Sequence, residues 1–217
     1  MKRVHIALVA LLVMGLTAVQ ALSTEQYSGS VETLRNGSLD RQQTESWIAM
    51  TVGDQVFLRD RLRTDSKALA ILGLPQVGRY VMGPNSQIEI GERVKDFTTT
   101  LVKGGVWVDA DLADGNTLTV KTVLASTGVR GTKFSVIHDE DGMDVCTCEG
   151  VVDLTLADGS VLTVPAGSFA PLDNNGASVG GVRSSSQILR RVGEGKNPRY
   201  DWCFTCHQVG GAMKKDW

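Results

Sequence analysis

The dominant pattern along the chain is a series of short runs in which apolar and polar residues alternate, separated by glycines. Side chains of a β-strand point alternately to its two faces, so this alternation is typical of strands with one buried face. Six runs show it: 46–52 (SWIAMTV), 67–72 (KALAIL), 86–90 (SQIEI), 105–108 (GVWV), 117–124 (TLTVKTVL) and 133–137 (KFSVI). Hardly any helical periodicity occurs before residue 184. The pattern predicts an all-β body built of short antiparallel strands and hairpins.

One phrase occurs twice in this region, as 112–120 (LADGNTLTV) and 156–164 (LADGSVLTV). Each copy contains Asp-Gly between alternating segments, at 114–115 and 158–159. Glycine accepts the positive φ that a tight hairpin turn needs. We therefore expect two similar hairpins, one after the other.

Several further phrases follow one another in a characteristic order between residues 30 and 170. They are 52–54 (VGD), 60–64 (DRLRT), 83–90 (GPNSQIEI), 104–106 (GGV), 128–136 (GVRGTKFSV), 149–152 (EGVV) and 164–167 (VPAG). In this order they resemble the FecR-like domain of bacterial envelope proteins. The resemblance implies a β-sandwich or β-roll in a periplasmic module, known best in regulators that relay an outer-membrane transport signal to a sigma factor. It implies no catalytic residues.

The first residues are typical of a secretory signal peptide. Lys2 and Arg3 precede an apolar run, 6–19, and residues 19–21 (VQA) offer the small side chains of a cleavage site. The apolar run is shorter than the roughly 20 residues that span a bilayer. We expect residues 1–21 to be removed, leaving a periplasmic or secreted protein of the bacterial cell envelope with no membrane span. FecR-like sigma regulators resemble single-pass membrane proteins with a cytoplasmic segment, so this departure argues against direct sigma control.

Composition narrows the class of partner. The chain has 22 Lys and Arg against 24 Asp and Glu, and removal of the leader makes the net charge about −4. This mild negative balance favours neither nucleic acid nor an anionic membrane surface as a partner. The sequence contains no nucleophile elbow and no phosphate-binding glycine loop. We therefore expect a non-enzymatic module that binds an envelope protein or a redox partner.

The composition changes after the β-rich region. Residues 173–198 are rich in Gly, Ser and Asn, which is typical of a linker, and 184–191 (SSSQILRR) predicts two helical turns within it. The expected organisation is therefore a signal peptide at 1–21, a β-domain at 22–172, this linker, and a cysteine-bearing tail at 199–217.

The tail contains Cys-x-x-Cys-His, the spacing that attaches a c-type haem, with the cysteines at 203 and 206. In such sites the two thiols bond covalently to the porphyrin and the adjacent imidazole ligates the iron. The motif predicts haem c held by Cys203, Cys206 and His207, for electron transfer or redox sensing.

Two residues are candidates for the sixth ligand of that iron, Met213 and His138. His138 precedes an acidic turn, 139–144 (DEDGMD), which we interpret as a solvated hairpin tip. Trp202, in the tail, either shields a porphyrin face or packs against the β-domain.

A second pair of cysteines, Cys146 and Cys148, lies in a predicted strand. Alternation places both thiols on one face with Cα atoms about 6.7 Å apart, so a disulfide between them would require the strand to bulge. With Cys203 and Cys206 they could instead form a four-thiolate zinc or iron site. Two disulfides between strand and tail, which an oxidising compartment favours, are the third interpretation. In the last two cases the cysteines staple the tail to the domain and no haem is present.

Overall fold

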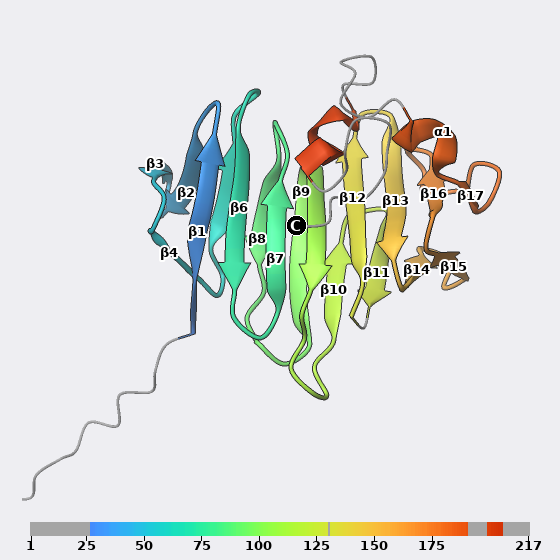
Figure 1. The fold of residues 1–217 in the computed structure, drawn as a ribbon, viewed down its shortest axis with the longest axis horizontal. Coiled ribbons are helices and arrows are strands. Elements are labelled where there is room, and N and C mark those ends of the chain that lie inside the picture. The colour runs from blue at the N-terminus through green and yellow to red at the C-terminus, as the bar shows by residue number, and fades with distance from the viewer. Residues whose placement is uncertain (1–26, 130, 191–198, 206–217) are drawn as a thin grey trace, which may run out of the picture.

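The computed structural model describes residues 27–129, 131–190 and 199–205, and in this part of the chain seventeen strands form two layers. The order across the first layer, sheet A, is β4 (Gln55–Phe57), β1 (Ser28–Arg35), β6 (Leu69–Leu74), β7 (Gly78–Met82), β9 (Phe97–Ala110), β12 (Lys133–Asp139), β13 (Gly142–Glu149), β16 (Ser168–Leu172) and β17 (Arg183–Ser184). The order across the second layer, sheet B, is β3 (Ser46–Met50), β2 (Leu39–Gln43), β5 (Arg61–Thr64), β8 (Gln87–Ile90), β9, β10 (Leu118–Lys121), β11 (Ala125–Val129), β14 (Val151–Leu156) and β15 (Val161–Pro165). Figure 1 shows strands β1, β6, β7, β9, β12 and β13 side by side.

The all-β prediction is confirmed. Within the described ranges the only helices are α1 (Ser186–Leu189), which overlaps the predicted helix, and a short 3-10 helix, η1 (Asp201–Thr205). Each of the six predicted alternating runs overlaps a strand. The part of the predicted linker that leads to α1 contains β17, which pairs with β16.

Strand β9 joins the two layers because it belongs to both. Its first half pairs with β8 and β10 in sheet B, and its second half pairs with β7 and β12 in sheet A. The change occurs at Gly104, whose φ is +85°. The hydroxyl of Ser86 then accepts the Gly105 N–H and donates to the Gly105 carbonyl, both at 2.9 Å. Glycine is suited to residue 104 because, without a side chain, it adopts a positive φ at no steric cost.

The main core lies between the sheets and follows the predicted alternation. Along β9, for example, Phe97, Thr99 and Leu101 are fully buried. The rings of Tyr80 and Phe97 meet edge to face with centroids 6.3 Å apart, and the Thr99 hydroxyl lies 3.1 Å from the Tyr80 hydroxyl. This core fixes the central strands on which the site described below is built.

A second, smaller cluster covers the opposite side of sheet A. Five outward-facing side chains from four neighbouring strands form it, and we call this surface the tail-docking face: Leu69, Ile71, Val81, Trp107 and Ile137. All five are buried, although they point away from the main core. The centre of sheet A is therefore covered on both sides, which explains why residues 69–72 are buried without interruption.

One of the two predicted Asp-Gly hairpins is present and the other prediction is wrong. The turn at 158–159 joins the antiparallel neighbours β14 and β15, as expected. The turn at 114–115 instead leads from the sheet A end of β9 to β10 in sheet B, and β10 pairs in parallel with the start of β9. Both glycines adopt similar positive φ, +76° and +83°. The local sequence thus determines the turn, whereas tertiary packing determines which strands pair.

Asp65 stabilises the loop that precedes the docking-face strand β6. Its carboxylate accepts backbone N–H bonds from Ser38, Lys67 and Ala68 at 2.8, 2.8 and 2.9 Å. The Lys67 bond is the largest cause of a pKa below the ordinary value of 3.8. Since the folded pKa is lowered, the stabilisation is present above pH 3.8 and is lost as the pH falls through the folded pKa.

We predict that Asp65→Ala lowers the melting temperature at pH 7, and that the difference from the wild type shrinks as the pH falls below about 4. Thermal unfolding followed by circular dichroism between pH 7 and pH 2.5 measures this, with Asp114→Ala on an exposed turn as the control. A difference that stays constant with pH would contradict the role of the carboxylate.

Candidate functional site

The described end of the chain, residues 199–205, packs on the tail-docking face. Helix η1 lies over β9 and β12 in Figure 1, with α1 beside it. Tyr200, Trp202 and Cys203 are only 8%, 8% and 5% exposed, and they complete the cluster with Ile188 of α1. Two positions were predicted for Trp202, on a porphyrin face or against the β-domain. In the structure it packs against the β-domain.

Two glycines of sheet A and its adjoining loop make room for the Trp202 indole. A methyl group at Gly105 would lie 2.5 Å from Cζ2 of the indole, and one at Gly83 would lie 2.7 Å from Cδ2. Both distances are far below van der Waals contact. The indole Nε1 donates to the Arg199 carbonyl at 2.9 Å. Gly83 and Gly105 therefore form a notch into which Trp202 fits.

Three of the four cysteines of the chain lie close together beside this notch. Cys146 is 5% exposed, Cys148 is half-buried, and their side chains are hydrogen-bonded. Cys203 belongs to the same cluster as Cys148. None of the three is joined to another by a disulfide. The structure thus brings the strand pair to the tail, as the two stapling interpretations require.

The strand that carries this pair is not regular. Thr147 pairs with Phe134 and Glu149 pairs with Lys133, so Cys148 is an extra residue on β13. Such a β-bulge changes the direction of the side chain at the extra residue, and bulges are common beside functional sites. The bulge at Cys148 was not predicted from the sequence.

Hydrogen bonding and burial keep the Cys146 and Cys203 thiols protonated. A hydrogen bond with Cys148, followed by burial, raises the pKa of Cys146 well above its ordinary value. Burial, followed by the nearby Cys148, raises the pKa of Cys203. The Ser185 and Ser135 side chains act in the opposite direction without reversing either pKa shift. These thiols are therefore protonated at neutral pH and poor nucleophiles, unlike an activated catalytic cysteine.

A polar group holds the start of the tail. The Tyr200 hydroxyl donates to the Asp144 carboxylate, and Arg199 lies 3.0 Å from Asp139 and 3.5 Å from Asp144. Asp144 is buried, so the interpretation of residues 139–144 as an entirely solvated tip is wrong at this position. Burial is the largest cause that raises the Asp144 pKa, and the Arg199 charge opposes it. The sequence signal that was missed is the Arg-Tyr-Asp-Trp phrase directly before the cysteine motif.

His138 lies apart from the thiols. Its neighbour Ile137 faces the tail, so alternation along β12 turns His138 to the other side. Its Nδ1 is 3.1 Å from the Val102 carbonyl oxygen. The other residues of the predicted haem site, Cys206, His207 and Met213, lie outside the described residues, as does the predicted signal peptide at 1–21. Haem attachment therefore stays a prediction of the motif.

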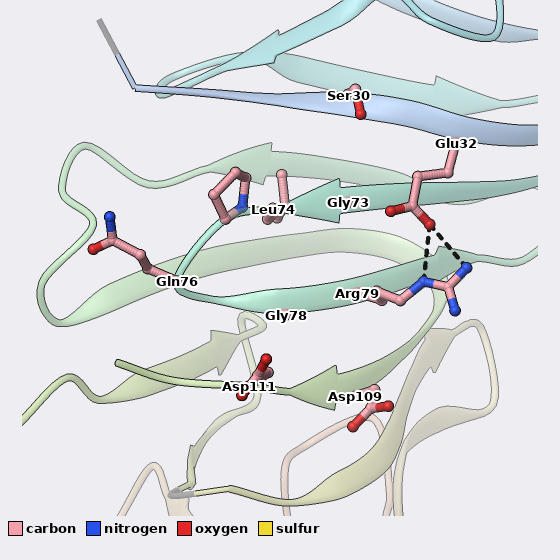
Figure 2. Close-up of a pocket in the computed structure, with 10 residues that line it drawn as sticks. Ser30, Glu32, Gly73, Leu74, Gln76, Gly78, Arg79, Asp109 and Asp111 are labelled. Carbon is pink, nitrogen blue, oxygen red and sulfur yellow. Dashed lines mark hydrogen bonds and ion pairs between the residues drawn. The ribbon is translucent and has the colours of Figure 1, made fainter. Parts of the chain in front are cut away.

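An open groove elsewhere on sheet A offers no comparable site. It has a volume of about 390 Å³ and is lined by residues of β1, β6, β7 and β9. Figure 2 shows Arg79 turned toward Glu32, and the two side chains form an ion pair at 2.8 Å. Asp109, in the same groove, lies 3.8 Å from Lys133. Glu32 and Asp109 each have a cationic neighbour already, and we assign no function to the groove.

The described residues contain no group of three or more His, Cys, Asp or Glu side chains that could hold a metal ion. No helix among them is long and apolar enough to cross a membrane.

Comparison with known proteins agrees with the fold. Residues 60–153, from β5 into β14, match the family model described as FecR protein. A search of curated proteins finds no match. The residues that receive the tail, from Gly83 to Cys148, lie inside the matched segment, whereas Trp202 and Cys203 lie outside it.

Two solved structures from Parabacteroides distasonis ATCC 8503, each described as a putative anti-sigma factor, resemble this chain. The first has a TM-score of 0.53 and 14% identity, and the match covers 65% of this chain and 74% of that one. The second has a TM-score of 0.48 and 16% identity, and covers 55% and 58%. The first match shows that the fold is shared.

We predict that Gly105→Ala releases the tail, because the added methyl group overlaps Trp202. Overpacking costs about 1–3 kcal/mol, so trypsin should cleave after Arg199 about tenfold faster or more. Mass spectrometry of timed digests measures the rate. Gly128→Ala is the matched control, since the nearest atom to the added methyl group is 4.0 Å away. Equal rates for the two variants would contradict the notch.

Proposed function

We propose that this chain is a non-enzymatic, FecR-like module of the bacterial cell envelope that binds a protein partner and relays a signal. The FecR match over residues 60–153 is the observation that carries this proposal. It agrees with the first solved structure, whose protein is described as a putative anti-sigma factor and which shares the fold. The predicted leader at 1–21 supports a periplasmic or secreted location.

The docked tail suggests how such a module acts. The tail covers an apolar face formed by strands that lie inside the FecR match. Release of the tail would expose several large apolar side chains, a surface of the kind that proteins use to bind one another. In the proposed relay, binding of the protein partner therefore depends on whether the tail is docked or released.

A c-type haem on Cys203, Cys206 and His207, used for electron transfer or redox sensing, is the alternative function. The Cys-x-x-Cys-His spacing supports it. The visible spectrum and the intact mass of the protein, produced in a host that matures c-type cytochromes, test this alternative directly.

We predict that the mature protein is found in the periplasmic fraction or the medium and begins at residue 22. Cell fractionation and N-terminal sequencing of a C-terminally tagged full chain measure both points. Recovery of the uncleaved chain from the cytoplasm would contradict the proposed location.

We also predict that deletion of the gene changes the transcription of a limited set of genes at least twofold. Gly128→Ala should restore the wild-type pattern, whereas Gly105→Ala, which releases the tail, should not. Transcript sequencing of the four strains measures this. An unchanged profile in the deletion strain would contradict signal relay.

A further inference from the structure

We infer that a disulfide oxidant modifies this protein at one site, where it joins Cys148 to Cys203 and so links the docked tail covalently to sheet A. The bond would connect β13, which begins inside the FecR match, to a tail that lies outside it. In the structure the two cysteines are not yet joined. The inference uses the docked tail and does not depend on the signal-relay proposal.

The docked tail fixes the position of Cys203. This residue lies in η1 directly after Trp202, whose indole occupies the notch. The Cys203 N–H donates to the Tyr200 carbonyl at 2.8 Å, so Cys203 is held within a tight turn. Its side chain is buried and hydrogen-bonded with Ser135 of β12. Because Ser135 pairs directly with Cys146, the Cys203 thiol lies beside the strand that carries the cysteine pair.

The bulge in β13 places Cys148 on the side of the tail. Cys148 is the extra residue of the bulge, and the pairing with β12 continues at Thr147 and Glu149 on either side of it. Bulges change the direction of a side chain in this way. The Cys148 side chain packs against the cluster that contains Cys203. After burial, Cys148 is the group that most raises the Cys203 pKa, which agrees with a short distance between the two thiols.

Exposure distinguishes the two strand cysteines. Cys146 is 5% exposed, and its side chain is hydrogen-bonded with Cys148 and with Ser185. Cys148 is only half-buried. Thiol–disulfide exchange requires access to the attacking sulfur atom. We therefore expect an oxidant to react first at Cys148.

The reaction takes two exchange steps with a protein or small molecule that itself contains a disulfide. In the first step, the Cys148 thiolate attacks one sulfur of the oxidant, forms a mixed disulfide and releases the other sulfur as a thiolate. In the second step, Cys203 gives up its proton and attacks the Cys148 sulfur, which releases the second sulfur of the oxidant. Two cysteine thiols thus lose two electrons and two protons, and the oxidant gains them as two thiols.

The bond would change how firmly the tail-docking face is covered. In the reduced protein only non-covalent contacts hold the tail. A disulfide between segments distant in the sequence restricts the chain when the tail is released, and so favours the docked state. The predicted leader would direct the chain to a compartment in which such bonds persist. Oxidation would therefore keep the face covered, and reduction would allow it to open.

The experiment uses the full chain, produced in the periplasm of a bacterium that forms disulfides and also matures c-type cytochromes. The protein is alkylated with N-ethylmaleimide before any reduction and then digested with trypsin. Peptide 134–183, which contains Cys146 and Cys148, should remain joined to peptide 200–214, which contains Cys203. Dithiothreitol should separate the two peptides. Mass spectrometry measures both results.

Two double variants locate the bond after reduction and addition of oxidised glutathione. Cys146→Ser with Cys206→Ser retains Cys148 and Cys203, and should form the linked peptides at the wild-type rate. Cys148→Ser with Cys206→Ser retains Cys146 and Cys203, and should form them about tenfold more slowly or less, because the accessible thiol is gone. The digest of the wild-type protein keeps the test valid if a serine variant fails to fold.

The effect on the tail has its own measurement. In the variant that retains Cys148 and Cys203, trypsin should cleave after Arg199 about tenfold more slowly in the oxidised than in the reduced protein. Timed digests, quenched and then reduced, measure the two rates. Equal rates would contradict the effect of the bond on docking.

Three results would overturn the bond itself. They are peptides that separate without reduction, linked peptides that require Cys146 or Cys206, and a haem spectrum with the corresponding added mass. Each concerns only the cysteines, so the transcriptional test of signal relay would stand or fall separately.

Discussion

The burial of sheet A on both faces is the constraint on which the structure depends. One face belongs to the main core, and the other is an apolar surface that solvent would otherwise cover. Burying each large apolar side chain contributes about 1.5–3 kcal/mol, so the tail gains stability by docking and the sheet loses it when the tail leaves. The position of the thiols follows from this, because the docked tail carries Cys203 to the strand pair.

The notch for Trp202 and the polar contacts of Arg199 and Tyr200 make this docking specific. Apolar contact alone is not directional. The indole of Trp202 fits only where Gly83 and Gly105 lack side chains. The hydrogen bond from Tyr200 to Asp144 holds the residues just before it. Together they set the position at which Cys203 of the tail meets Cys146 and Cys148 of β13.

Much of the fold could be predicted from the sequence, because each strand has its own local pattern. Alternation predicted the all-β body, and the order of the FecR-like phrases agrees with the match over 60–153. Relations between distant segments could not be predicted. The passage of β9 between the sheets, the turn at 114–115 that crosses layers, and the burial of Asp144 all depend on tertiary contacts. The pairing of strand and tail thiols was one of several open interpretations for the same reason.

The docked tail is tested most directly by nuclear Overhauser contacts in the full-length protein. Protons of the Trp202 indole should show contacts to the α-protons of Gly83 and Gly105, since the indole lies in the notch that these two glycines form. The same contacts should disappear in Gly105→Ala and persist in Gly128→Ala. Random-coil chemical shifts for residues 199–205, with no contact to either glycine, would contradict docking.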